Sequence, residues 1–203
     1  MVLKKCSIII ICSPFEDRQN FVQEVFAMSL REDRAIQVIL GRRSIRKFQK
    51  DRKVEPEKLE IILECAQAAP TAGGTRPWHF VVVDERSLLD ALAEAHPYGK
   101  MLHEAGLAVV VCGDPSISDF AKRYWEEDCS AAMQNILLAS QALGLGSVWL
   151  GVNNSPGRPE AIRKVLGIPQ HINVLGIAAI GYPAESKEPH SGYDNQRVHH
   201  NKW

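Results

Sequence analysis

Four cations surround one serine in the segment GRRSIRKF, residues 41–48. Three of them are arginines, Arg42, Arg43 and Arg46, whose planar guanidinium groups suit bidentate contacts to a phosphate or to the polar edge of a ring. If the chain is extended after the glycine, alternation places Arg42, Ser44 and Arg46 on one face. That face could clamp a flat, phosphorylated ligand, although a run of charges is also typical of a solvated turn.

The chain offers few other residues whose spacing indicates catalysis. The glycines of GLGSVWLG, residues 144–151, lie between a helix-like and a strand-like segment, whereas a dinucleotide-binding fingerprint runs from strand through GxGxxG to helix. The sequence contains no GxxxxGK[ST], HExxH, GxSxG or CxxC motif. We therefore name no catalytic residue and no metal ligand. Cys129 is interpreted as a packing residue rather than as a nucleophile, because no activating cation accompanies it.

Composition is that of an ordinary globular protein. The 203 residues carry a formal net charge of zero and are 45% hydrophobic, which is enough to bury the core of one domain. A neutral chain has no overall field to attract nucleic acid, and no aromatic residues interleave with the cations, so a nucleic-acid partner is disfavoured. The five cysteines are an odd number without paired spacing, which is typical of a reducing compartment.

Residues 1–30 are expected to form an N-terminal extension to which the sequence assigns no role. Lys4 and Lys5 precede the apolar run CSIIIIC, which imitates a signal peptide but is short and lacks a small-residue cleavage site close behind it. No later apolar run approaches the roughly 20 residues needed to cross a bilayer. We therefore expect a cytoplasmic protein that does not enter the membrane.

From residue 31 the pattern of apolar residues predicts a single α+β domain that continues to residue 203. Helical spacing predicts helices over residues 35–40, 56–69, 86–95, 128–143 and 158–167. Short apolar runs predict strands over residues 78–84, 105–114, 146–151 and 173–183. Gly41 is expected to stop the first helix at a C′ position, and residues 70–77 are expected to form a loop.

Three stretches together resemble the nitroreductase family of FMN-dependent oxidoreductases. They are RRSIRKF near the start, AAPTAGGTRPWHFVVVD at 68–84 and AAMQNILLASQALGLGSVWLG at 131–151, followed by IGYPAE and RVHHNKW. The likeness covers the chain from about Ile36 to the C-terminus. It implies an FMN-binding α+β sandwich in which helices flank a mostly antiparallel central sheet. It also implies an intertwined homodimer with FMN at the subunit interface.

The resemblance assigns flavin contacts to particular positions. The residues that match cofactor-binding positions are Arg42, Arg43, Ser44, Arg46, Pro70, Thr71, Ala72, Gly74, Leu150, Gly151 and Lys187. Arg42, Ser44 and Arg46 match the positions that hold the pyrimidine edge, the ribityl chain and the phosphate, and Arg43 is an adjacent candidate. The loop at 70–74 matches one that packs on the ring system, often from the other subunit, and Gly74 stands where many members carry Asn. Gly192 occupies the place of a basic phosphate ligand; Lys187 and Arg197 are the cations nearest to it, and Lys187 is assigned this contact.

The implied function is hydride transfer from NADH or NADPH through FMN to a small electron-poor acceptor, such as a nitroaromatic or a quinone, with ping-pong kinetics. Two alternatives remain open: a flavin-fragmenting or dehalogenating member of the same family, and a non-enzymatic flavin-binding module. Members of the first kind carry an inserted lid, for which the short span between Gly99 and Asp128 leaves limited room. The aromatic residues that could line such a lid, or could equally be ordinary partly buried residues, are His96, Tyr98, Tyr124 and Trp125.

Overall fold

The computed structural model describes residues 30–190 and 192–203 and divides between Leu40 and Gly41 into two units. All but the last residue of the N-terminal extension expected over residues 1–30 therefore lies outside the described residues. The helix α3 (Arg34–Gly41) begins after Asp33, whose carboxylate accepts the N–H groups of Ala35 and Ile36 at 2.9 and 3.3 Å. This is an N-cap, and none of the residues of α3 is buried.

Helix α3 ends at Gly41, as expected, but the C′ position was wrong. Gly41 is the last residue of the helix, and it is not among the glycines that take a positive φ. The chain leaves the helix directly into an extended segment, in which the N–H of Ile45 donates to the carbonyl of Ser147 at 3.0 Å. A left-handed residue would redirect the chain at this point, so the extended pairing replaces the expected cap.

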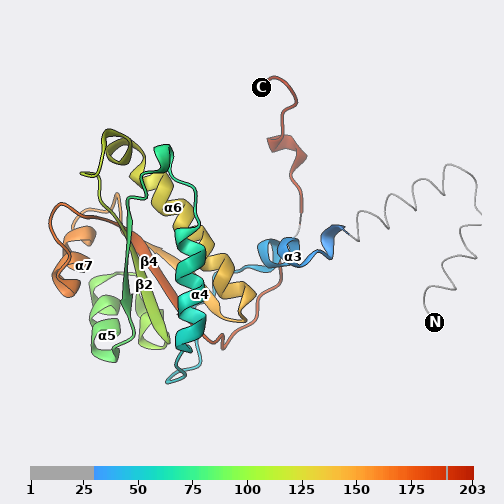
Figure 1. Cartoon of the computed structure of the whole chain (residues 1–203). Coiled ribbons are helices and arrows are strands. Elements are labelled where there is room, and N and C mark those ends of the chain that lie inside the picture. Colours follow the sequence, from blue (N-terminus) through green and yellow to red (C-terminus); the bar gives the residue numbers. More distant parts are fainter. Residues whose placement is uncertain (1–29, 191) are drawn as a thin grey trace, which may run out of the picture. The chain divides into compact units, whose positions relative to one another are not determined.

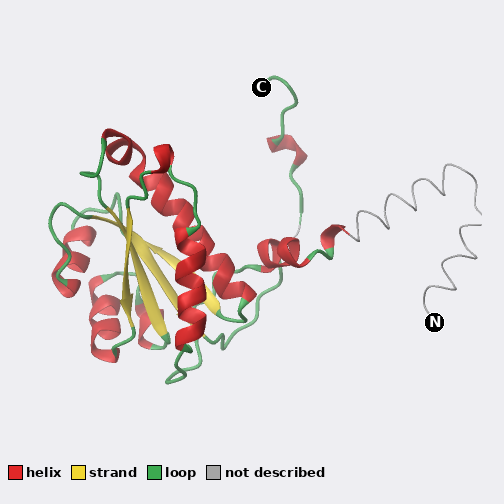
Figure 2. Cartoon of the chain, viewed as in Figure 1, coloured by secondary structure: helices red, strands yellow, loops and turns green. Residues whose placement is uncertain are grey.

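The second unit is built on a four-stranded antiparallel sheet (Figures 1 and 2). Its strands are β1 (Trp78–Val83), β2 (Leu107–Gly113), β3 (Gly146–Gly151) and β4 (Asn173–Gly181), in the spatial order β1-β2-β4-β3. Every residue of β2 is buried, as is every residue of β4 after Asn173. Such continuous apolar runs are expected where both faces of a sheet are covered.

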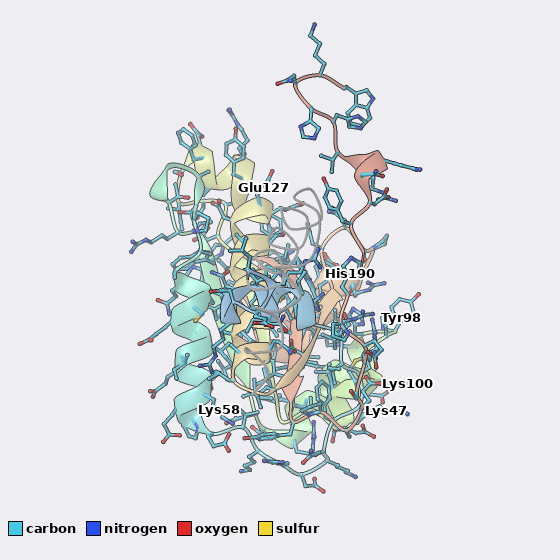
Figure 3. All side chains as sticks on the ribbon, turned by 90° about the vertical axis from the view of Figure 1, so that its right-hand side faces the viewer. Lys47, Lys58, Tyr98, Lys100, Glu127 and His190 are labelled. Carbon is cyan, nitrogen blue, oxygen red and sulfur yellow. The ribbon has the colours of Figure 1, made fainter. Side chains whose placement is uncertain are left out.

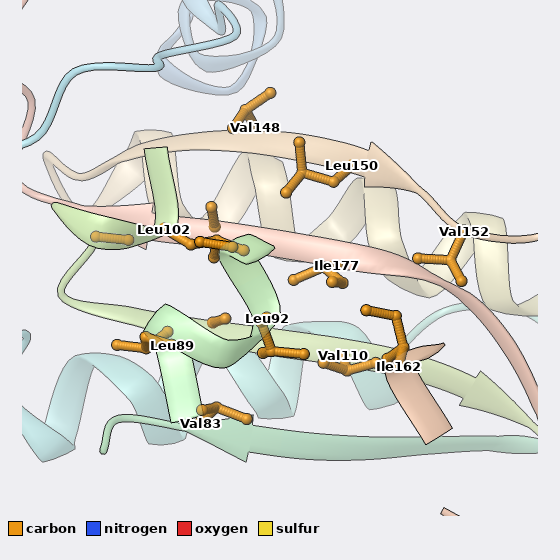
Figure 4. Close-up of a cluster of buried hydrophobic side chains, with 14 of the residues drawn as sticks. Val83, Leu89, Leu92, Leu102, Val110, Val148, Leu150, Val152, Ile162 and Ile177 are labelled. Atoms are coloured by element: carbon orange, nitrogen blue, oxygen red, sulfur yellow. The ribbon is translucent and has the colours of Figure 1, made fainter. Parts of the chain in front are cut away.

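Helices cover both faces of this sheet, as the resemblance implied. Figure 1 shows α4 (Pro56–Gln67) and α6 (Asp119–Ala142) on one face, and α5 (Arg86–Ala95) and α7 (Arg158–Leu166) on the other. Alternate residues of β2 serve the two cores: Val109 and Val111 pack toward α4 and α6, while Val110 lies in the other cluster with Leu92 and Ile162 (Figure 4). The α+β sandwich with an antiparallel sheet is therefore confirmed.

The predicted helices are found, but α6 starts nine residues earlier than its apolar spacing indicated. Its first part, DFAKRYWEE, is mostly charged or aromatic and shows little helical periodicity. The start is fixed instead by Ser118, whose hydroxyl accepts the N–H of Ala121 at 3.0 Å. The end of α7 was predicted correctly, since Gly167 caps it with a φ of 67°.

Candidate functional site

The basic segment expected to clamp a ligand is extended and forms one wall of a pocket. Ser44 pairs with Ser147 at the start of β3, and this pairing buries the side chain of Ile45. A cavity of about 370 Å³, here named the basic pocket, adjoins the segment. Its lining residues are Arg42, Arg43, Ser44, Arg46, Lys187 and His190. Because no carboxylate belongs to this lining, the pocket suits an anion.

The chain that follows β4 is fastened to the basic segment. The Nζ of Lys187 donates to the carbonyl of Ser44 at 2.6 Å, and Arg43 donates to the carbonyl of Glu188 at 2.8 Å. The carboxylate of Glu185 accepts the N–H of Arg46 at 2.5 Å and forms an ion pair with Lys187 at 3.4 Å. The Arg46 N–H and then Lys187 lower the pKa of Glu185 from its ordinary value. These contacts bring Lys187 to the same pocket as the three arginines of the basic segment.

Arg46 also lines a larger cavity of about 680 Å³ and is the residue that the two linings share. The lining residues of this large cavity are Arg46, His96, Pro97, Tyr98, Lys100, Met101, Val148, Trp149, Leu150, Gly151, Asn153, Ser155 and Arg158. The structure thus brings Leu150 and Gly151 together with the basic segment. A Cβ added to Gly151 would meet no atom within 4 Å, so the main chain at this residue is open to solvent or to a ligand.

The carbonyl of Gly151 is held from two sides. The guanidinium of Arg158 donates to it at 2.8 Å, and Nε2 of His96 lies 2.9 Å from it. The N–H of Tyr98 donates to Nδ1 of His96 at 3.1 Å, which requires Nδ1 to be unprotonated and places the ring hydrogen on Nε2. His96 is therefore a neutral donor to Gly151, and its buried ring fixes the main chain at the edge of the large cavity.

We expect the free energy of unfolding to decrease as the pH falls below about 6.5. Burial lowers the pKa of His96 from its ordinary 6.5, the charge of Arg158 lowers it further, and the hydrogen bond to Gly151 opposes the shift. The unfolded chain therefore binds a proton at a pH where the folded protein still excludes it, and proton uptake favours unfolding. Urea unfolding between about pH 7.5 and 5.5 measures this slope. His96→Gln cannot titrate and should show a shallower slope; equal slopes in both proteins would refute the assignment.

The loop matched to residues 70–74 lies apart from both cavities, whose linings include none of Pro70, Thr71, Ala72 or Gly74. The buried carboxylate of Asp128 holds this loop, because its Oδ1 accepts the N–H of Ala72 at 2.8 Å. Gly74 has a φ of 68°. Since Asn and Gly are the residues that tolerate this conformation best, the position suits either residue type.

The aromatic residues considered for a lid divide into two groups. His96 and Tyr98 line the large cavity, whereas Trp125 is buried in the core cluster of α6 and Tyr124 stacks on Phe120 with ring centroids 6.2 Å apart. Two further lining residues, Lys100 and Arg158, were not found from the sequence. Lys100 lies in a short helical turn and Arg158 is the first residue of α7. No local sequence pattern indicated that these two segments line the same cavity.

Thiol nucleophiles, metal sites and membrane-spanning helices were also considered for the part of the chain that the structure describes. Burial raises the pKa of both Cys112 and Cys129 to about 12, so these thiols are inert packing groups rather than nucleophiles. No group of three or more His, Cys, Asp or Glu side chains within residues 30–190 and 192–203 is arranged to hold a metal ion. In the same part of the chain, no helix combines the length and apolar character that crossing a membrane requires.

Comparison with known proteins gives this site a context. The model of the Nitroreductase family matches residues 39–97 and 93–182. A protein of Archaeoglobus fulgidus, named provisionally as an NADH dehydrogenase/NAD(P)H nitroreductase, is 44% identical over 174 residues, which cover 84% of this chain and 99% of that protein.

Two solved structures are similar as well. A protein of Parabacteroides distasonis with the same provisional name is 44% identical, with a TM-score of 0.80 and coverage of 85% of this chain and 100% of that chain. The FMN-dependent nitroreductase of Clostridium difficile is 37% identical, with a TM-score of 0.77 and coverage of 83% and 99%. The chain belongs to the nitroreductase family.

Proposed function

We propose that the protein is an FMN-dependent oxidoreductase that uses NADH or NADPH to reduce a small electron-poor acceptor, such as a nitroaromatic compound or a quinone. The observation that carries this proposal is that Arg46 lines both the basic pocket and the large cavity. A molecule with an anionic end and a flat ring system suits such a pair of cavities. The names of the similar proteins, which include FMN and NAD(P)H, support the same proposal.

The basic pocket fits the phosphate end of FMN. Within the described residues, no hydrogen bond or ion pair joins the guanidinium of Arg42 or of Arg46 to another group, so their donors are available to a ligand. Arg43 and Lys187 each use a donor on the neighbouring chain and add positive charge to the same wall. The guanidinium group of an arginine can donate two parallel hydrogen bonds to a dianionic phosphate, and such charge-assisted hydrogen bonds are strong.

The large cavity fits the ring end. Trp149, Leu150 and Gly151 bring apolar side chains and an open stretch of main chain to it, and His96 and Arg158 fix the Gly151 peptide. Bound FMN would supply the redox chemistry, by accepting a hydride from the nicotinamide and passing it to the acceptor. The chain itself has to hold and orient the flavin and to stabilise the charge that develops on it. These roles require no side-chain acid or base. We accordingly assign no catalytic side chain.

We further propose that the site is completed by a second copy of the chain. The loop at 70–74, assigned to the flavin ring by resemblance, lies apart from both cavities of its own chain, so a partner's loop would have to supply this contact. Helix α3 exposes Ile36 and Ile39, and Trp203 at the C-terminus is fully exposed. Apolar groups left uncovered in this way favour a homodimer.

An absorbance spectrum of the purified protein, followed by anaerobic addition of NADH or NADPH, tests the proposal. Flavin bands at about 370 and 450 nm that bleach with either nucleotide are expected, because an enzyme-bound flavin is reduced by its donor. Light scattering on the same fraction should give about twice the chain mass of 22.6 kDa. A flavin that binds but resists both donors would favour a binding module. A colourless protein that ignores added FMN would overturn the assignment.

A further inference from the structure

The large cavity carries more positive charge than the proposed flavin contacts need. Besides Arg46, which the proposed function assigns to the cofactor, its lining includes Lys100 and Arg158. The lining contains no Asp or Glu to balance these two cations. In a chain whose formal net charge is zero, such an excess on one wall is a local feature.

Arg158 is held so that most of its guanidinium can serve a ligand. It opens α7 after Gly157, whose φ of 73° turns the chain into the helix. One of its N–H groups donates to the Gly151 carbonyl, which is its hydrogen-bond partner within the part of the chain that the structure describes. The nearest acid on α7, Glu160, pairs with Arg163 at 3.5 Å instead. A guanidinium has five N–H donors, so the remaining ones can bind an anion while the side chain stays fixed.

Tyr98 gives the same part of the cavity a flat wall. The guanidinium carbon of Arg158 lies 5.9 Å from the centroid of its ring, and the ring is largely exposed. Figure 3 shows Tyr98 and Lys100 toward the same side of the molecule as His190, a residue of the basic pocket. An aromatic wall beside two cations suits a ring that bears an acidic group, because the ring can stack while the acid meets the charges.

We propose that Arg158 and Lys100 form an acid-binding subsite that selects electron acceptors carrying a carboxylate on a flat, electron-poor ring. This inference rests on the proposed function and names a substrate class for it. For a nitro compound, the first two-electron step is ArNO₂ + NAD(P)H + H⁺ → ArNO + NAD(P)⁺ + H₂O. The carboxylate takes no part in this step and serves to hold the ring in the cavity. A phosphate group of the nicotinamide nucleotide shares this anionic chemistry, so the test must separate the two sources.

Paired acceptors make the test specific. With FMN-loaded full-length protein and saturating donor, kcat/KM is measured for 4-nitrobenzoate and for 4-nitrobenzamide, which differ in charge but little in shape. The ratio of the two values is expected to fall about tenfold in Arg158→Gln and about threefold in Lys100→Gln, since an exposed lysine contributes less. Arg158→Lys should restore part of the ratio. Lys164→Gln, which removes an exposed charge at the far end of α7, should leave the ratio unchanged.

Each other outcome has a definite meaning. An equal loss with both acceptors would assign Arg158 only to the positioning of Gly151 and would overturn the subsite. A change in the NADPH to NADH ratio of kcat/KM, without a change in the acceptor ratio, would assign the cations to the nucleotide and overturn it as well. If neither acceptor is reduced and neither donor bleaches the flavin, the proposed function fails. Calorimetric titration with 4-nitrobenzoate then still tests the subsite, because Arg158→Gln should bind it about tenfold more weakly, and equal affinity would refute it.

Discussion

Replacing Arg42 and Arg46 together by glutamine is expected to weaken FMN binding by about a hundredfold or more, because a hydrogen bond to a charged group contributes about 1.5–3 kcal/mol and each 1.4 kcal/mol is a factor of ten. Both side chains line the basic pocket without a partner among the described residues. The double substitution removes two guanidinium groups from the lining of the basic pocket, but it breaks no contact that holds the fold. Quenching of flavin fluorescence on titration of the flavin-free protein measures the dissociation constant.

Two controls accompany this measurement, a variant at another position and a flavin without a phosphate. Lys164→Gln removes one exposed charge elsewhere and should bind FMN as the wild type does. Riboflavin, which lacks the phosphate, should bind the double variant and the wild type with similar affinity if the two arginines act on the phosphate. A similar loss for both flavins would place the arginines on the ring edge. An unchanged affinity for FMN would show that the basic pocket does not hold the cofactor.

The elements that could be predicted from the sequence are those in which local pattern and tertiary burial agree. Residues 107–113 are an uninterrupted apolar run and form the most buried strand, and residues 86–95 form a helix with the predicted bounds. The first part of α6 could not be predicted from periodicity, because its charged residues are solvated and only the Ser118 cap marks the start. Gly41 was misjudged because pairing of the next residues with β3 decides how that helix ends.

The candidate site shows the same division. Residue type and spacing at 42–46 predict an anion clamp, and this role stays a prediction. The segment is extended at Ser44, but alternation does not separate its arginines, because Arg43 lines the same pocket as Arg42 and Arg46. Lys100 and Arg158 could not be found in this way. Lys100 and Arg158 reach the large cavity from positions 58 residues apart along the chain, and His96 meets Gly151 across a separation of 55 residues. Local patterns carry no information on which loops of a sandwich meet, so these contacts require the fold.

Gly176→Ala is expected to lower the free energy of unfolding by about 1–3 kcal/mol, the usual cost of forcing an extra methyl group into a packed interior. Gly176 pairs with Gly151 across β4 and β3. A Cβ at this position would lie 2.5 Å from Nε1 of Trp149 and 2.7 Å from the carbonyl oxygen of Leu150. The backbone oxygen can move only if the pairing of the two strands changes. Urea unfolding of the variant and the wild type measures the loss.

The same substitution should also weaken FMN binding, since the two groups that must move belong to the wall of the large cavity. Gly41→Ala is a matched control, because its Cβ would meet only the flexible side chain of Gln141 at 3.6 Å. At this helical position alanine is favoured over glycine, so stability should stay equal or rise slightly. A Gly176→Ala protein as stable as the wild type would mean that Trp149 and β3 can shift freely. Loss of stability with unchanged FMN affinity would separate the packing of β3 and β4 from the proposed flavin site.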